Sequence, residues 1–262
     1  MTAISKAFEC TFHLRRYHSL YYTLGSASFS SATIRNLLQR LSFIHDFYSE
    51  VELHDARILE FGGGPTIYSL ISAAPYTREI IFTDINSQAL EEIRRWKESQ
   101  PDALDFSDVI GYVVGELEKR DPEECLRRTE SLKKLITKLV KCDFRQPHEL
   151  FEEDMNPQFD VVSVHFCLCC SASLDEYRSN LVKLSKLLRP GGYLLLSDAL
   201  EERRIKVGDE VFSSSLFLTE DALLDSIKQC GLEIHQVSLL EDSCTELSDT
   251  TKRITLAAKK PC

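Results

Sequence analysis

The sequence predicts an α/β fold in which a doubly wound, mostly parallel sheet lies between layers of helices. Two observations support this prediction. From Ala56 onward, short apolar runs alternate with longer amphipathic stretches, and parallel strands joined by crossover helices require this alternation. Near the C-terminus, a polar stretch separates the apolar runs at 233–240 and 253–258, so these two runs are expected to pair as an antiparallel hairpin.

Four earlier apolar runs predict the parallel strands. Each reads as a buried strand that ends at a polar residue or a glycine, and together they lie at 57–61, 79–84, 159–164 and 192–198. The amphipathic stretches between them predict helices at 66–74, 87–99, 122–140 and 173–188. In the last stretch, apolar side chains recur at three- and four-residue steps, which places them on one face of a helix.

The first 55 residues differ in character from the rest. An aromatic cluster, Tyr17, Tyr21 and Tyr22, precedes a helical pattern over 32–48, and we expect this part to form a helical lid over the sheet. No internal repeat, low-complexity tract or linker marks a second domain. The sequence therefore predicts a single domain, 1–262, with the lid at 1–55, the sheet and helices at 56–262 and an insertion at about 200–218.

Composition excludes several classes of function. The chain has 262 residues, 43% of them hydrophobic, which suffices for a core, and its net charge of −10 would repel phosphate backbones and anionic membrane surfaces. No window approaches eighteen uninterrupted apolar residues. The nine cysteines are an odd number without an apolar secretory segment ahead of them, so we expect free thiols and a cytoplasmic protein, without nucleic-acid or membrane partners.

The strongest local motif is a strand that runs into Gly62-Gly63-Gly64 and then into a helical pattern. Three glycines let the backbone approach a ligand closely and leave N–H groups directed at it. A dinucleotide-binding turn, Gly-x-Gly-x-x-Gly, would need its third glycine where this chain has Ile67. The motif therefore disfavours a nicotinamide-dependent oxidoreductase.

Two acids come after the glycine turn in the sequence. Asp84 comes about twenty residues after the glycines, where a carboxylate can accept both ribose hydroxyls of an adenosine. Asp143 follows an apolar run and can meet the exocyclic amine of adenine while Phe144 packs on the base, although an Asp ahead of a loop is more often a cap or turn residue. The glycine turn and the spaced acid together predict a nucleoside-containing cofactor.

With the Leu-Leu-Arg-Pro-Gly-Gly turn at 187–192, these motifs occur in an order that resembles class I S-adenosylmethionine (SAM)-dependent methyltransferases. More closely, the chain resembles the family of nicotinamide, phenylethanolamine and indolethylamine N-methyltransferases, and the Gly-Pro-Thr-Ile-Tyr run at 64–68 is specific to that family. The resemblance implies a Rossmann-like methyltransferase sheet, SAM as cofactor and methyl transfer to a pyridine or amine nitrogen of a small molecule. The matching segments are 21–22 with 25–26, 64–73, 83–84, 142–143, 187–192, 198–200, 208–210 and 212–214.

The resemblance also implies a cofactor site. Tyr17 and Tyr22 would close over cofactor and substrate, the glycines and Tyr68 would hold the methionine end, and Val164 would supply a backbone contact. At Ala89 the family has an asparagine, so the adenosine contacts differ there. The implied cofactor residues are Tyr17, Tyr22, Gly62, Gly63, Gly64, Tyr68, Asp84, Ala89, Cys142, Asp143, Phe144 and Val164.

The substrate side combines features of two branches of the family. Asp198 and Ser214 match the carboxamide-binding residues of the nicotinamide-methylating members, and Glu201 matches an amine-binding carboxylate of the phenylethanolamine branch. An alkylamine must lose a proton before it attacks, whereas a pyridine nitrogen is already unprotonated at pH 7. The candidate catalytic residues are Asp198, Tyr17 and Glu201, and the candidate substrate-binding residues are Tyr17, Asp198, Ala199 and Ser214.

Departures from the family leave alternatives open. Arg204 and Ile205 replace an aromatic pair of the nicotinamide enzymes, and Leu168 replaces an acid after the fourth strand, so both substrate classes and an inactive SAM-binding module remain possible. His165 is interpreted as a structural histidine or a base facing the pocket. The cysteines at 167, 169 and 170 lack paired ligand spacing elsewhere, so no metal is predicted. We expect a monomer whose partner is a small-molecule amine or pyridine.

Overall fold

The computed structural model describes residues 14–24, 31–143, 145–146, 159–207, 210–214, 216–241 and 247–262. Its centre is a seven-stranded sheet with the order β3-β2-β1-β4-β5-β9-β8. Neighbouring strands run parallel from β3 to β5, whereas β9 is antiparallel to β5 and β8, so the predicted sheet and C-terminal hairpin are confirmed. The strands are β1 (Ala56–Phe61), β2 (Thr77–Asp84), β3 (Ile136–Lys141), β4 (Phe159–His165), β5 (Leu188–Leu200), β8 (Glu233–Glu241) and β9 (Lys252–Lys259).

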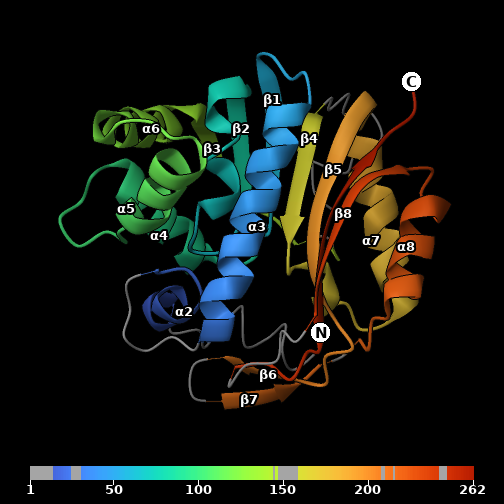
Figure 1. Ribbon diagram of the computed structural model, residues 1–262. Helices are drawn as coiled ribbons and strands as arrows, with labels where there is room; N and C mark the ends of the chain where they lie inside the picture. The colour runs from blue at the N-terminus through green and yellow to red at the C-terminus, as the bar shows by residue number, and fades with distance from the viewer. Residues whose placement is uncertain are drawn as a thin grey trace.

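Helices cover both faces of the sheet (Figure 1). One face shares a core with α3, α4, α5 and α6, and the other shares a core with α7 and α8. Because the central strands are buried on both faces, their sequences are nearly continuous apolar runs. No helix within the described ranges is long and apolar enough to cross a membrane. The helices are α3 (Ser31–Glu50), α4 (Ser87–Lys97), α5 (Ser107–Gly111), α6 (Pro122–Leu135), α7 (Leu174–Leu187) and α8 (Glu220–Gln229).

The order of strands reverses at β1, which pairs with β2 on one side and β4 on the other. Phe61, the last residue of β1, lies opposite Thr83 of β2 and Val164 of β4. The chain segments that follow these strands therefore begin at one edge of the sheet. In doubly wound sheets, ligands bind at the carboxyl ends of the strands where the order reverses.

A helix and a two-stranded hairpin lie beyond this edge (Figure 1). The hydroxyl of Tyr21, at the end of the first described helix, donates a hydrogen bond to the carbonyl of Lys206 at 3.2 Å. Leu14 of the same helix packs against Ala89 of α4. The insertion expected at about 200–218 contains a hairpin that the sequence analysis did not predict. These elements are α2 (Leu14–Tyr21), β6 (Arg204–Val207) and β7 (Glu210–Ser213).

The prediction of a helix over 66–74 is wrong. The segment forms two short 3-10 turns, Tyr68–Leu70 and Ala74–Tyr76, joined by a tight turn at 71–73 and not by a continuous α-helix. Pro75 cannot continue an α-helix, because its ring clashes with the preceding turn. Every residue from Thr66 to Ala74 is buried, so the segment lacks the polar face of a surface helix.

The prediction of a helix over 122–140 is wrong in its second part. α6 ends at Leu135, and Ile136 begins edge strand β3 without a loop. Ile136, Thr137 and Val140 are β-branched, which favours an extended backbone. The strand escaped the pattern analysis because most of its side chains are partly or fully exposed.

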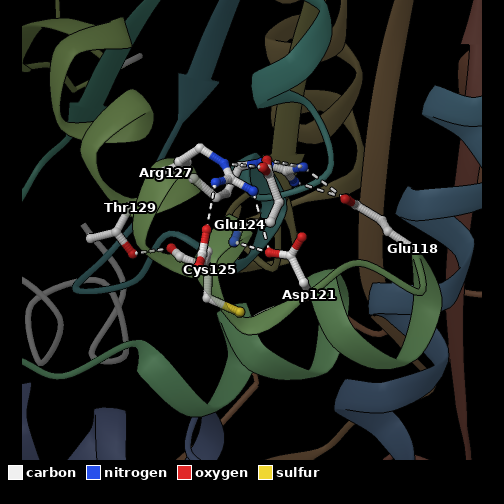
Figure 2. A network of polar contacts seen from close by, with 8 residues as sticks. Glu118, Asp121, Glu124, Cys125, Arg127 and Thr129 are labelled. Atoms are coloured by element: carbon white, nitrogen blue, oxygen red, sulfur yellow. Dashed lines mark hydrogen bonds and ion pairs between the residues drawn. The ribbon is translucent and has the colours of Figure 1, made fainter.

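Charged side chains stabilise the N-terminal half of α6. The Asp121 side chain caps the helix by accepting from the backbone N–H of Glu124 at 3.0 Å. Figure 2 shows Arg127 reaching back to Glu124 and Asp121 on the exposed side. The next residue, Arg128, is only 4% exposed and donates to both carboxylate oxygens of Glu118 at 2.8 and 2.7 Å. The two arginines thus occupy opposite environments.

Candidate active site

Two neighbouring cavities lie at the carboxyl edge of the sheet. The first is lined by the glycine turn, the end of β2 and the segments after β3 and β4. The second is lined by side chains of α2 and α3, the end of β5 and the segments that flank β6, β7 and β9. Four residues line both cavities, so the two spaces share a wall made of Tyr17, Tyr22, Phe166 and Cys170.

The glycine turn is built for close approach. Gly62 and Gly64 have φ angles of +67° and +62°, which side chains disfavour. A Cβ atom at Gly63 would lie 2.3 Å from the Phe82 ring, whereas one at Gly64 would meet nothing within 4 Å. The turn therefore leaves open space on the side where Gly64 lines the first cavity.

Asp84 anchors the turn and also faces the cavity. Its carboxylate accepts hydrogen bonds from the backbone N–H groups of Gly64 at 2.8 Å and Asn86 at 2.7 Å. Burial raises the pKa of Asp84 to about 6, although these hydrogen bonds oppose the rise. A carboxylate has about four acceptor sites, so capacity for further donors remains.

Two residues that line the first cavity, Tyr68 and Glu60, carry buried polar atoms. Oε2 of Glu60 lacks a hydrogen-bond partner among the described residues, and the Tyr68 side chain contacts the Arg40 guanidinium. Burial raises the pKa of Glu60 to about 7, against the hydrogen bonds from Ser163 and Ser69. Tyr22 stacks on Tyr68 with ring centroids 5.2 Å apart. Buried polar groups are normally satisfied, so this end of the cavity suits a polar ligand group.

The other end of the first cavity holds the predicted adenine residues. Cys142 and Asp143 both line it, whereas Phe144 lies outside the described residues, as do residues 25–26 and 208–209 of the matching motifs. Burial would raise the pKa of Asp143, but hydrogen bonds from Arg145 at 2.7 and 2.9 Å outweigh it and hold that pKa below its usual value. Ala89 also lines this cavity.

Two predicted residues on β4 have different surroundings. Val164 is buried in the core and does not line either cavity. His165 lines the first cavity, and its ring nitrogens lie 3.0 Å from the Ser163 hydroxyl and 2.8 Å from the Ser197 hydroxyl. Burial and the charge of Arg40 lower the pKa of His165 to about 3, so the ring is neutral at pH 7. This geometry supports the structural interpretation of His165.

Asp198 is fully buried at the end of β5 and does not line either cavity. Its carboxylate accepts from the Tyr177 hydroxyl at 2.8 Å and from the backbone N–H of Cys169 at 3.3 Å. Burial raises the pKa of Asp198 to about 7, although both hydrogen bonds oppose this. The other predicted substrate residues, Tyr17, Ala199 and Ser214, do line the second cavity.

The side chains of the consecutive residues Glu201 and Glu202 lie in different environments. Glu201 has a φ of +55°, and its carboxylate accepts from the Thr251 hydroxyl at 3.3 Å, outside both cavities. Glu202 is 6% exposed, lines the second cavity and accepts from the Ser248 hydroxyl at 2.5 Å. Burial raises the pKa of Glu202, and the Ser248 hydrogen bond and the Arg253 charge offset part of that rise.

A model of the NNMT/PNMT/TEMT family matches residues 2–261. The chain belongs to this family. It is 32% identical to the nicotinamide N-methyltransferase of Homo sapiens over 257 residues, covering 95% of this chain and 93% of the relative. It is 28% identical to the indolethylamine N-methyltransferase of Mus musculus over 242 residues, covering 92% and 88%. This chain is therefore a SAM-dependent N-methyltransferase.

A solved structure shows the same fold with the cofactor. The magnesium protoporphyrin IX methyltransferase of Synechocystis PCC 6803 with bound SAM superposes with a TM-score of 0.60 at 14% identity, over 98% of this chain and 95% of that one. The first cavity of this N-methyltransferase fits the same cofactor. Asp84 retains acceptor capacity, and Tyr68 and Glu60 are polar residues in the lining of this cavity.

Sequence reasoning missed the polar side chains that α3 presents to the second cavity of this methyltransferase. Thr33, Asn36 and Arg40 are all buried and all line that cavity, as does Arg253 of β9. They follow helical spacing within a stripe that is otherwise apolar, Leu37, Leu41 and Ile44. Polar residues in the buried stripe of a helix are a signal of function that the sequence already contained.

Proposed function

We propose that this enzyme methylates a pyridine or amine nitrogen of a small molecule bound in the second cavity, with a nicotinamide-like compound or an arylalkylamine as substrate. The observation that carries the proposal is the shared wall of Tyr17, Tyr22, Phe166 and Cys170. It supports an acceptor directly beside the methionine end of the cofactor. The names of the relatives, nicotinamide and indolethylamine N-methyltransferase, support the same substrate classes.

When bound, SAM supplies an electrophilic methyl group whose bond to sulfur breaks as the acceptor nitrogen's lone pair bonds to it, leaving S-adenosylhomocysteine. The protein's contribution is to position the acceptor and to exclude water. Tyr17 and Tyr22 support this role, because their hydroxyls lie 3.4 Å apart and their rings separate the two cavities. The proposed cofactor-binding residues are those implied by the family resemblance, with Asp84 on the ribose.

An amine substrate needs a group that receives its proton. Glu202 is the candidate that lines the second cavity, and its raised pKa favours proton uptake. Asp198 does not line the cavity itself. It contacts the cavity wall by accepting a hydrogen bond from the backbone N–H of Cys169. The roles given to Tyr17, Asp198 and Glu201 from sequence remain predictions. We also propose a cytoplasmic monomer without nucleic-acid partners.

The decisive experiment is incubation with SAM and a panel of nicotinamide, other pyridines, tryptamine, phenylethanolamines and histamine, with products identified by mass. We expect one product heavier by a methyl group and one equivalent of S-adenosylhomocysteine. The absence of a methylated product from every nitrogen nucleophile would contradict the proposal. Equilibrium dialysis with S-adenosylhomocysteine would then show whether the chain still binds the cofactor as an inactive module would.

A further inference from the structure

Arg40 is a buried cation in the wall of the second cavity. Its residue is 8% exposed on α3, and it lines this cavity but not the first. The centre of its guanidinium lies 4.7 Å from the centroid of the Phe166 ring and 5.2 Å from that of Tyr68. Aromatic faces attract a cation, so both rings stabilise the guanidinium.

Arg40 forms no ion pair with any carboxylate in the part of the chain that the structure describes, and its Nε is buried there without a hydrogen-bond partner. Removing a charge from water is unfavourable, and two cation–π contacts offset only part of that cost. Buried charges are normally paired. Arg40 therefore has the properties of a group whose counter-ion is a ligand.

The other charges of the second cavity do not supply that counter-ion. Glu202 accepts from Ser248 at 2.5 Å, and its pKa responds to Arg253 rather than to Arg40. The charged residues that line the cavity are Arg40, Arg253 and Glu202, two cations and one anion. This local excess of positive charge contrasts with the chain's net charge of −10. A low-dielectric cavity with such an excess selects anions.

We propose that Arg40 binds a carboxylate of the methyl acceptor, so that the substrate carries an anionic group beside its nucleophilic nitrogen, as a pyridine carboxylate does. This inference rests on the proposed function and narrows its substrate class. The planar guanidinium matches a carboxylate with two parallel hydrogen bonds, a pairing stronger than that between neutral groups. The aromatic walls, Tyr17, Tyr21, Tyr22 and Phe166, suit a flat ring attached to that carboxylate.

A carboxylate could also come from the methionine end of the cofactor, because Tyr68, which Arg40 contacts, lines the first cavity. Arg40 lines the second cavity and not the first, which favours the carboxylate of the acceptor over that of the cofactor. Removing the cation should weaken acceptor binding in the first case and cofactor binding in the second. One set of variants therefore separates the two carboxylate sources.

The test uses nicotinate and nicotinamide, which differ only in carrying a carboxylate or a carboxamide. Both are compared in the wild type, Arg40→Met, Arg40→Lys and the control Arg35→Met, which alters an exposed arginine of the same helix outside both cavities. The readouts are kcat/KM and, without turnover, calorimetric binding of each compound to the enzyme saturated with S-adenosylhomocysteine. We expect the wild type to favour nicotinate in both readouts.

Arg40→Met should lower the nicotinate-to-nicotinamide ratio by roughly 10- to 100-fold, the loss expected for a charged hydrogen bond. Arg40→Lys should retain part of the preference, and Arg35→Met should retain all of it. A wild-type enzyme that binds nicotinamide more tightly than nicotinate would overturn the inference without touching the proposed N-methyltransferase activity. So would an Arg40→Met enzyme with weakened S-adenosylhomocysteine binding and an unchanged ratio, because Arg40 would then hold the cofactor's carboxylate. The calorimetric comparison decides even if neither pyridine is methylated.

Discussion

Single atoms decide the geometry of the glycine turn, and Gly63 gives the sharpest test. In Gly63→Ala the new Cβ would lie 2.3 Å from the Phe82 ring, so the turn or the ring must move. We expect the variant to lose the increase in melting temperature that S-adenosylhomocysteine gives the wild type. Gly111→Ala is the matched control, because its Cβ meets nothing within 4 Å and its backbone is helical. An undiminished shift in Gly63→Ala would contradict the role given to the turn.

The raised pKa of Asp198 leads us to expect that the stability of the protein depends on pH. Its pKa is about 7 in the folded protein against 3.8 as the ordinary value, so the folded state keeps a proton that the unfolded state has released between these pH values. The contribution of Asp198 to stability is therefore present at low pH and is lost as pH rises from about 4 to 7. The free energy of unfolding of the wild type should fall relative to Asp198→Asn across this window, by up to roughly 4 kcal/mol. Chemical denaturation at several pH values measures the difference, and a constant difference would refute it.

The adjacent glutamates test which residue accepts the substrate's proton. The family resemblance indicates Glu201, and the cavity lining indicates Glu202. Glu202→Gln should lower kcat/KM for an amine substrate by about 100-fold, the scale of a lost general base, because Glu202 lines the second cavity. Glu201→Gln, made in parallel, tests the role that the family resemblance gives to Glu201. If Glu201→Gln causes the larger loss, the proton acceptor is Glu201 and the loop after β5 must rearrange on substrate binding.

At the scale of elements, α6 offers neighbouring arginines in opposite environments. Arg128→Met leaves the half-buried Glu118 without its two hydrogen bonds and also removes a donor to the carbonyl of Ile71 at 2.7 Å. We expect the free energy of unfolding to fall by about 2 to 4 kcal/mol. Arg127→Met removes only exposed ion pairs and should change it by less than about 0.5 kcal/mol. Similar losses in urea denaturation would show that burial of Arg128 is not what matters.

Elements were predictable where one rule dominated. Strands β1, β2, β4 and β5 are buried on both faces, so their apolar runs located them, and α7 begins at its Ser173 cap as its apolar stripe indicated. Edge strand β3 and the β6–β7 hairpin were missed because their partly exposed side chains carry little apolar signal. The helix predicted before Pro75 was wrong because the surrounding fold, and not a helical apolar face, buries the apolar side chains of this segment.

At the scale of the whole molecule, the cofactor half of the site was more predictable than the substrate half. Gly64 and Asp84 lie in consecutive strand–turn units, and the fold brings such units to one edge by a general rule. Arg40 and Arg253 meet in the second cavity from opposite ends of the chain, and no local motif records that meeting. The division into a single domain of 1–262 remains a prediction.

The wall shared by the two cavities also has a kinetic consequence. Tyr17 lies on α2 and Tyr22 follows it directly, and each contributes to both cavities. If this helix moves, both cavities open together. Neither product can then leave its cavity while the other cavity stays closed. Steady-state analysis should give intersecting double-reciprocal lines, the pattern of an enzyme that assembles a ternary complex before it releases anything.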